Sequence, residues 1–280
     1  MVGNEADKYV PQAYWEEQHH RADLSAVGQV GLSSQMNEWL YRAVRINIGR
    51  FLDRNTVLPV ERALDVGTGT GFWASFWHGR GIRVVDGSDL IPDAIKRLRA
   101  HPAGPGEYFI ADISNSTAFA ERQPYPIVSC MSVLLHVTED ECFASAIRNL
   151  STVTAYGGYL VIVDAVLTRD SRPRRRASVA SSVARPLGDF VQPLKSHGMQ
   201  LVDVAPAAVL ASNPIEGPLV VFWALQMAWW WLVAIDRWLP FMRNVAGRLL
   251  LTLDVALAST GFAPGTKVLL FRRVTDPPAL

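Results

Sequence analysis

Acidic side chains follow three short apolar runs in the first half of the chain, and a glycine-rich turn lies beside the first run. The segments are ALDVGTGTG (63–71), VVDGSD (84–89) and ADI (111–113). Glycines at such a turn allow a ligand to approach the backbone closely, and a following helix offers it free N–H groups. Carboxylates at the ends of successive parallel strands meet at one edge of an open α/β sheet, where ligands bind. The pattern predicts a nucleotide-binding edge.

The carboxylates at this edge have separate expected roles. Asp89 stands about twenty residues after the glycines, where the first crossover brings a side chain beside a bound ribose, and Asp86 is the alternative. Asp112 is expected to accept a hydrogen bond from an adenine amino group while Ile113 packs on the ring. For each aspartate alone a turn or cap role is the alternative, but three such sites in succession favour a ligand.

A histidine follows the fourth apolar run, at a position where side chains face a bound ligand in such a sheet. His136 has a resting pKa suited to removing a proton from a substrate. A purely structural histidine is the alternative. The acidic stretch after it, 138–141, is interpreted as a helix cap, because Thr followed three residues later by Glu forms a capping box. We predict no metal site.

The elements that must position these residues alternate between strands and helices. Short apolar runs separated by helical stretches indicate βαβ units and an α/β fold with a mainly parallel, doubly wound sheet. Strands are predicted at 63–66, 82–86, 108–110, 127–131, 159–163, 200–204 and 267–274, and helices at 33–53, 71–79, 92–100, 115–121, 139–154 and 186–197. We expect a helical lid over residues 1–60, followed by one domain over 61–280.

Charge and cysteine content exclude some classes of protein. The formal net charge is +1, from 27 basic and 26 acidic side chains, so no global field favours a nucleic-acid partner. Two cysteines, Cys130 and Cys142, form neither a disulfide framework nor a metal spacing. The N-terminal residues lack a secretory pattern. We therefore expect a cytoplasmic protein.

With these residues in view, the chain resembles the class I S-adenosylmethionine-dependent methyltransferases, in particular the small-molecule type with a general methyltransferase domain. The matching segments, in the family's order and spacing, are ALDVGTGTGF (63–72), VVDGSD (84–89), ADI (111–113), IVSCMSVLLHV (127–137) and GGYLVIVD (157–164). Pro126 and Tyr156 depart from the family pattern. The third glycine comes one residue earlier than in G-x-G-x-x-G, which disfavours a nicotinamide-dependent oxidoreductase.

The resemblance implies a Rossmann-like sheet with an antiparallel last strand, S-adenosyl-L-methionine as cofactor, and roles for particular residues. The implied cofactor-binding residues are Asp65, Gly67, Thr68, Gly69, Gly71, Asp89, Leu90, Asp112, Ile113 and Met131. Tyr41 and Arg42 are expected to close over the cofactor carboxylate, with ordinary surface or core roles as the alternative.

Four further residues are candidates for the substrate side. Tyr14 and Trp15 are expected to form part of the lid. Asp164, at the end of the fifth strand, would assist His136 or bind a divalent ion. Arg176 closes an arginine run and would hold a polar substrate group by a forked hydrogen bond, with a solvated charge run as the alternative.

These residues together predict methyl transfer to a hydroxyl on a small molecule or saccharide, with His136 as the base. One alternative is an adenosylmethionine-binding protein without methyl transfer. Another is a membrane-associated methyltransferase that acts on a lipid-linked glycan.

A tryptophan-rich segment at 219–235 raises the question of a membrane. Its 17 residues would form a helix of about 26 Å, slightly shorter than a bilayer core requires. A span would also place the strand at 267–274 on the far side of the membrane. We therefore interpret the segment as a buried helix in a cap inserted at about 211–262, which covers the acceptor pocket or forms a homodimer face. Contact with the inner membrane surface is the alternative.

Overall fold

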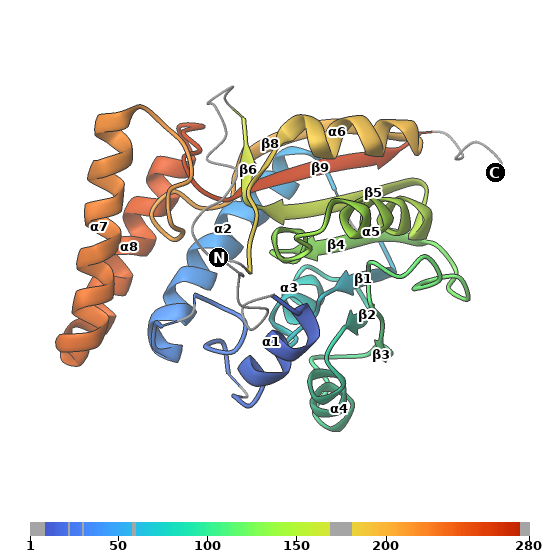
Figure 1. Ribbon diagram of the computed structural model, residues 1–280, viewed down its shortest axis with the longest axis horizontal. Coiled ribbons are helices and arrows are strands. Elements are labelled where there is room, and N and C mark those ends of the chain that lie inside the picture. The colour runs from blue at the N-terminus through green and yellow to red at the C-terminus, as the bar shows by residue number, and fades with distance from the viewer. Residues whose placement is uncertain (1–8, 22, 30, 58–59, 169–180, 275–280) are drawn as a thin grey trace, which may run out of the picture.

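A seven-stranded sheet forms the centre of the protein in the computed structural model, which describes residues 9–21, 23–29, 31–57, 60–168 and 181–274 (Figure 1). The sheet order is β3-β2-β1-β4-β5-β9-β8. Its strands are β1 (Arg62–Val66), β2 (Val84–Asp89), β3 (Tyr108–Ile110), β4 (Tyr125–Met131), β5 (Thr154–Asp164), β8 (Met199–Pro206) and β9 (Lys267–Arg273). The short strands β6 (Val166–Leu167) and β7 (Arg185–Pro186) pair separately.

Strand directions confirm the predicted doubly wound α/β sheet. Neighbouring strands from β3 to β5 pair in parallel, while β9 is antiparallel to both β5 and β8. The chain runs outward from β1 to β3 and then returns to place β4 on the other side of β1. Ligands of open α/β sheets bind at such a reversal, beyond the carboxyl ends of the strands.

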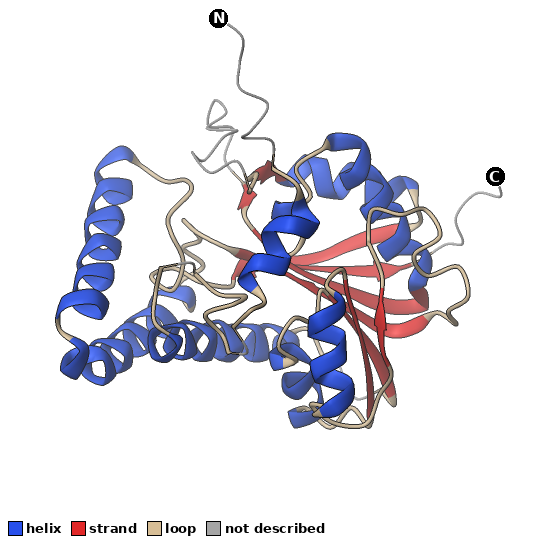
Figure 2. Ribbon diagram, turned by 60° about the horizontal axis from the view of Figure 1, so that its bottom comes forward, coloured by secondary structure: helices blue, strands red, loops and turns tan. Residues whose placement is uncertain are grey.

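Helices cover both faces of the sheet (Figure 2). The helices are α1 (Pro11–Gln18), α2 (Ser34–Arg54), α3 (Phe72–Gly79), α4 (Pro92–Ala100), α5 (Asp140–Val153), α6 (Leu187–Ser196), α7 (Leu219–Trp238) and α8 (Arg243–Ala258). Apolar residues of α5 and α6 form one core with the sheet, and those of α2 and α3 form the other. Because both faces are covered, the central strands are continuous apolar runs, as in β4 and β5.

The predicted helix at 115–121 is wrong, because this segment forms turns. The Asp112 carboxylate accepts the backbone N–H of Ser114 at 2.8 Å, and the Asn115 amide oxygen accepts that of Thr117 at 3.1 Å. Such side-chain bonds to the following backbone compete with helical hydrogen bonding. The turns leave Asp112 at the end of β3.

The tryptophan-rich segment forms α7, and with α8 it lies between β8 and β9, where an insertion was predicted. Its predicted burial is wrong: only Leu232 and Asp236 of α7 are buried, and Trp231 is 67% exposed. In both views α7 stands at the outer edge of the molecule, while α8 packs along α2. The apolar residues surround α7, but only one side of the helix has a partner.

Candidate active site

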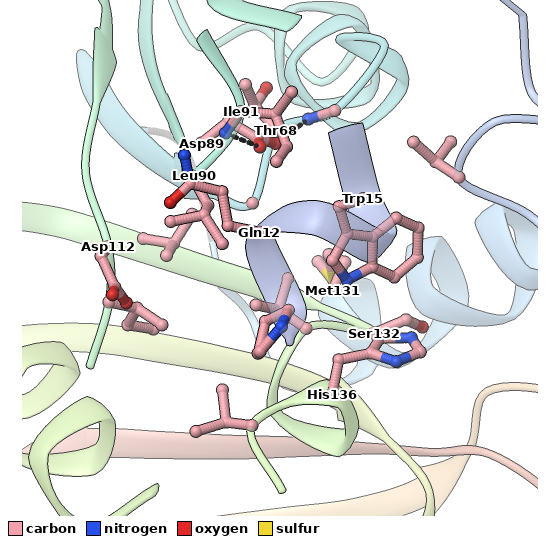
Figure 3. A pocket seen from close by; sticks show the side chains of 18 of the residues that line it. Gln12, Trp15, Thr68, Asp89, Leu90, Ile91, Asp112, Met131, Ser132 and His136 are labelled. Carbon is pink, nitrogen blue, oxygen red and sulfur yellow. Dashed lines mark hydrogen bonds between the residues drawn. The ribbon is translucent and has the colours of Figure 1, made fainter. Parts of the chain in front are cut away.

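A cavity of about 370 Å³ lies beyond the carboxyl ends of β1, β2 and β4 (Figure 3). It contains most of the residues that the sequence assigned to a cofactor. The predicted residues that line it are Trp15, Tyr41, Gly67, Thr68, Gly69, Asp89, Leu90, Asp112, Ile113, Met131 and His136. Residues more than 120 positions apart therefore meet at one site, as expected from their places after successive strands.

The glycine turn after β1 needs glycine for conformation and for space. Gly67, Gly69 and Gly71 have φ angles of 72°, 53° and 81°, in the region that other residues rarely adopt. A Cβ at Gly67 would lie 2.2 Å from Val133 Cγ2. Gly71 caps α3 and does not line the cavity, so its contribution is to the turn.

We expect Gly67→Ala to weaken binding of S-adenosylhomocysteine at least tenfold, because the new methyl group pushes Val133 into the cavity. Gly157→Ala is the matched control, since Gly157 has the same φ of 72° and nothing within 4 Å of its Cβ position. Both variants incur about 1–2 kcal/mol of backbone strain. Titration calorimetry measures the difference, and Gly67→Ala with Val133→Ala should restore binding. Equal affinity in the two single variants would contradict this account.

Asp89 is built into the wall of the cavity. Its two carboxylate oxygens accept the N–H groups of Gly69 at 2.8 Å and Ile91 at 2.9 Å, and the residue is 8% exposed. Burial raises the pKa of Asp89. Each oxygen can accept a further hydrogen bond, so the carboxylate can hold two ligand hydroxyls.

The alternative residue for this role, Asp86, faces away from the cavity. Its carboxylate accepts the Tyr125 hydroxyl at 2.7 Å, the Arg62 Nε at 3.1 Å and the Glu107 N–H at 2.8 Å. These bonds join β2 to its neighbours. The structure therefore favours Asp89 over Asp86 as the ribose ligand.

Asp65 lies behind the glycine turn and does not line the cavity in the described part of the chain. It accepts the Ser129 hydroxyl at 2.7 Å, and the Trp77 indole N–H donates to that hydroxyl at 2.9 Å. Burial raises the pKa of Asp65 to about 7. Its place indicates a role in holding the turn rather than in a direct cavity contact.

Helix α1 covers the cavity with side chains that the sequence analysis missed. Gln12 and His19 line it together with Trp15, and the intervals of three and four residues put all three on one helical face. Arg97 donates to the His19 carbonyl at 2.9 Å and fixes the end of α1. The spacing of these three residues could have identified this face of α1, but a search for apolar stripes does not detect it because Gln12 and His19 are polar.

The predicted pair on α2 separates into one cavity residue and one surface residue. Tyr41 lines the cavity, and its hydroxyl donates to the Val27 carbonyl at 3.0 Å. Arg42, by contrast, does not line the cavity in the described residues, contrary to the prediction. It is exposed, pairs with Glu38 at 3.2 Å and stacks on Trp39. Adjacent helical residues diverge by about 100°, so only one of the pair can face the cavity. Among the described lining residues none is Lys or Arg.

His136 ends the short 3₁₀ turn η2 (Leu134–His136). Its Nδ1 lies 2.6 Å from the Ser181 carbonyl oxygen, which can only accept, so Nδ1 carries the proton and Nε2 has a free lone pair. The Trp15 ring packs edge-on at 4.8 Å between centroids, beside His136 in Figure 3. Burial lowers the pKa of His136 and so keeps the imidazole neutral at pH 7.

Asp164 and Arg185 hold this turn in place. Asp164 accepts the N–H of Leu135 at 3.0 Å, and Arg185 donates to the Val137 carbonyl at 2.7 Å. Burial raises the pKa of Asp164 to about 7. Asp164 does not line either cavity in the described residues, so its predicted contact with substrate or a divalent ion is wrong, although it supports the turn that carries His136. Arg176 lies outside the described residues.

A second cavity of about 330 Å³ adjoins the first, and His136, Trp15 and Ser132 line both. Tyr14 lines only the second. Ser132 has a φ of 59°, a strained conformation at the junction. The other lining side chains include hydroxyls, amides and apolar groups: Gln29, Asn37, Leu40, Val44, Ser181, Ser182, Ala208, Ala211, Ser212 and Thr266. No residue of α7 or α8 lines either cavity in the described part of the chain.

The sheet order, the glycine turn and the carboxylate at the end of β2 define a class I S-adenosylmethionine-dependent methyltransferase fold. Residues 63–158 match the methyltransferase domain family. The matched segment, about a third of the chain, is a methyltransferase domain, and the first cavity lies where S-adenosylmethionine would bind in this fold. The residues fit this cofactor: Asp89 offers a buried carboxylate to the ribose, Leu90 and Ile113 offer apolar faces to the adenine, and the glycine turn admits the methionine part.

Part of the chain is similar to curated methyltransferases, and solved methyltransferase structures share its fold. The Ubiquinone biosynthesis O-methyltransferase of Hahella chejuensis is 33% identical over 91 residues, covering 32% of this chain and 38% of that protein. The match thus spans less than half of the curated relative. A putative sarcosine dimethylglycine methyltransferase from Galdieria sulphuraria has a TM-score of 0.55 at 15% identity, covering 84% and 86% of the two chains. Magnesium protoporphyrin IX methyltransferase from Synechocystis PCC 6803 with bound SAM has a TM-score of 0.53 at 14% identity, covering 98% and 100%.

Proposed function

We propose that this protein transfers the methyl group of S-adenosylmethionine to a hydroxyl of a neutral small molecule or saccharide. The observation that carries the proposal is the position of His136, a neutral histidine that lines both the cofactor cavity and the second cavity. A base at that junction can reach a hydroxyl presented to the cofactor. The names of the curated relatives, O-methyltransferases, support an oxygen acceptor.

Methyl transfer requires alignment and removal of one proton. The bound cofactor supplies a methyl group already activated by a positively charged sulfur. His136 would accept the hydroxyl proton of the acceptor at Nε2 as its oxygen is methylated, and S-adenosylhomocysteine would be the leaving product. The Ser181 carbonyl holds the Nδ1 proton and so keeps Nε2 as the accepting atom. Trp15 and Tyr41 exclude water from the junction.

The lining of the second cavity supports a neutral acceptor. Its described residues include no Asp, Glu, Lys or Arg. Aromatic rings of Tyr14, Trp15 and Trp73 offer contact area to a ring or sugar face. Hydroxyls such as those of Ser212 and Thr266 can orient polar groups of the acceptor.

We also propose that the enzyme works in the cytoplasm and on no nucleic acid. The two cysteines, Cys130 and Cys142, are free thiols, which suits a reducing compartment. The net charge of +1 supplies little attraction to a polyanion.

The test uses the full chain, methyl-labelled S-adenosylmethionine and fractionated metabolite extracts. We expect a labelled product together with S-adenosylhomocysteine, and the label should resist alkaline hydrolysis because it is an ether. A thermal shift with S-adenosylhomocysteine but neither product would overturn methyl transfer and favour a binding protein. Stronger stabilisation by NAD than by S-adenosylhomocysteine would overturn the cofactor assignment itself.

A further inference from the structure

Helices α7 and α8 and the turn between them expose a large set of apolar side chains. We define the hairpin face as these exposed residues: Leu219, Val220, Trp223, Met227, Trp230, Trp231, Trp238, Phe241, Val245, Leu249 and Leu253. Val220, Phe241 and Trp238 are 82%, 80% and 72% exposed. Scattered exposed apolar residues are ordinary, but a gathering of this size marks an interaction surface.

Both acidic residues of the hairpin are buried, whereas two of its three arginines are exposed. Five charged residues occur between Gly217 and Pro264, all described. The acidic ones are buried and bonded: Asp236 pairs with Arg243 at 2.8 Å, and Asp254 accepts the N–H groups of Val209, Leu210 and Ala211.

The exposed charges are therefore cationic. They are Arg237 and Arg248, and they lie beside residues of the hairpin face on both helices. The Arg237 guanidinium lies over the Trp238 ring, 5.6 Å from its centroid. Tryptophan beside arginine is the combination that binds at the boundary between lipid headgroups and acyl chains, and exposed cations with no exposed acid attract an anionic surface.

A surface location agrees with the topology better than a span does. Helix α7 is the one helix in the described part of the chain that is long and apolar enough to cross a membrane, with 20 residues and a mean hydropathy of 1.6. However, β8 before it and β9 after it pair in the same sheet. Asn47 of α2 also donates to Asp254 of α8 at 2.8 Å, so α8 is attached to the body of the protein.

The buried side of the hairpin packs against residues that line the second cavity. Leu232 of α7 and Leu250 of α8 belong to one apolar cluster with Leu40, Ala208 and Ala211, and the last three also line that cavity. Ser33 donates its backbone N–H to Asp236 at 2.6 Å and joins α7 to the start of α2. A surface that binds the exposed side of the hairpin is therefore separated from the second cavity by the hairpin and the cavity wall.

We propose that the hairpin face docks on an anionic lipid bilayer, with α7 lying in the headgroup region and the second cavity held close to the membrane. This docking goes beyond the proposed reaction and does not depend on it. A second copy of the chain is the competing occupant, and it would bury the same tryptophans without any dependence on lipid charge.

Vesicle flotation with the full chain tests the proposal. The probes are vesicles of phosphatidylglycerol and phosphatidylcholine mixed, and vesicles of phosphatidylcholine alone. We expect at least tenfold stronger binding to the anionic vesicles, weakening with added salt. Trp223→Gln with Trp231→Gln and Trp238→Gln should abolish binding, and Arg237→Gln with Arg248→Gln should weaken it roughly 30-fold.

Tyr156→Gln is the matched control, because Tyr156 is an aromatic residue 70% exposed outside the hairpin, and its variant should bind vesicles like the original chain. Titration with S-adenosylhomocysteine shows whether each variant is folded and separates failure of docking from failure of the proposed function. Vesicle binding unchanged by the tryptophan variant, or absent in the original chain, overturns the proposal. A dimer in sedimentation equilibrium that the tryptophan variant dissociates, without vesicle binding, assigns the face to a second copy.

Discussion

Replacing His136 with Asn is expected to lower kcat by about 10²–10⁴-fold, the usual contribution of a general base. The asparagine amide can still donate to the Ser181 carbonyl, which His136 Nδ1 reaches at 2.6 Å, so the turn should keep its shape. Only the proton acceptor at Nε2 is lost. Labelled methyl transfer to the acceptor found in extracts measures kcat, and calorimetry should show unchanged affinity for S-adenosylhomocysteine.

His78→Asn is the matched control for this prediction. His78 makes the same kind of bond, from Nδ1 to the Ile82 carbonyl at 2.9 Å, but lines neither cavity in the described residues. Burial lowers the pKa of His136 from its ordinary 6.5, so the imidazole is unprotonated at pH 7 and can act as a base. Activity should be flat near pH 7 and fall as the solution becomes more acidic. Full turnover in His136→Asn would remove the residue from the mechanism.

Replacing Asp89 with Ala is expected to weaken binding of S-adenosylhomocysteine about 100-fold or more. The carboxylate accepts two backbone N–H groups and has capacity for two ribose hydroxyls, and hydrogen bonds to a charged group contribute about 1.5–3 kcal/mol each. Loss of the side chain also frees the N–H of Gly69 and loosens the glycine turn. Calorimetry measures the affinity directly, without an acceptor.

Asp86→Ala separates this effect from general damage to β2. Asp86 is 1% exposed and bonds Arg62, Tyr125 and Glu107 away from the cavity. Its removal should lower the free energy of unfolding yet leave affinity for the cofactor product almost unchanged in the folded fraction. If both variants lost affinity equally, Asp89 would have no special contact with the ribose.

The sheet and the cofactor edge could be predicted from sequence because they depend on local patterns. A continuous apolar run predicts a covered strand, and a carboxylate after it lies at the carboxyl edge whatever the rest of the chain does. Asp89 and Asp112 both line the cavity for that reason. The position of His136 follows from the same rule.

Residues outside this rule were harder to predict. Whether Tyr41 or Arg42 faces the cavity depends on how α2 rotates against its neighbours, and neither residue type settles that rotation. Gln12 lies in the short helix α1 and His19 directly follows it. The place of this helix over the cavity depends on tertiary contacts such as that of Arg97 with His19.

The burial of α7 was predicted wrongly because an apolar composition shows only that side chains favour burial. It does not show whether another part of the protein packs against them. Leu232 finds one in the cluster with Leu250, whereas Trp231 beside it faces outward. A helix that is apolar on every side has no distinct core face, so its sequence does not reveal which side the body covers.

The place of β9 has a consequence for how the sheet is completed during synthesis. The strand lies between β5 and β8, and β8 has no other neighbour in the described sheet. A ribosome delivers β8 and the whole hairpin before residues 267–273 emerge. The cofactor edge, carried by β1, β2 and β4, is made far earlier. The strands of the cofactor edge can therefore pair during synthesis before β8 has its partner strand, β9.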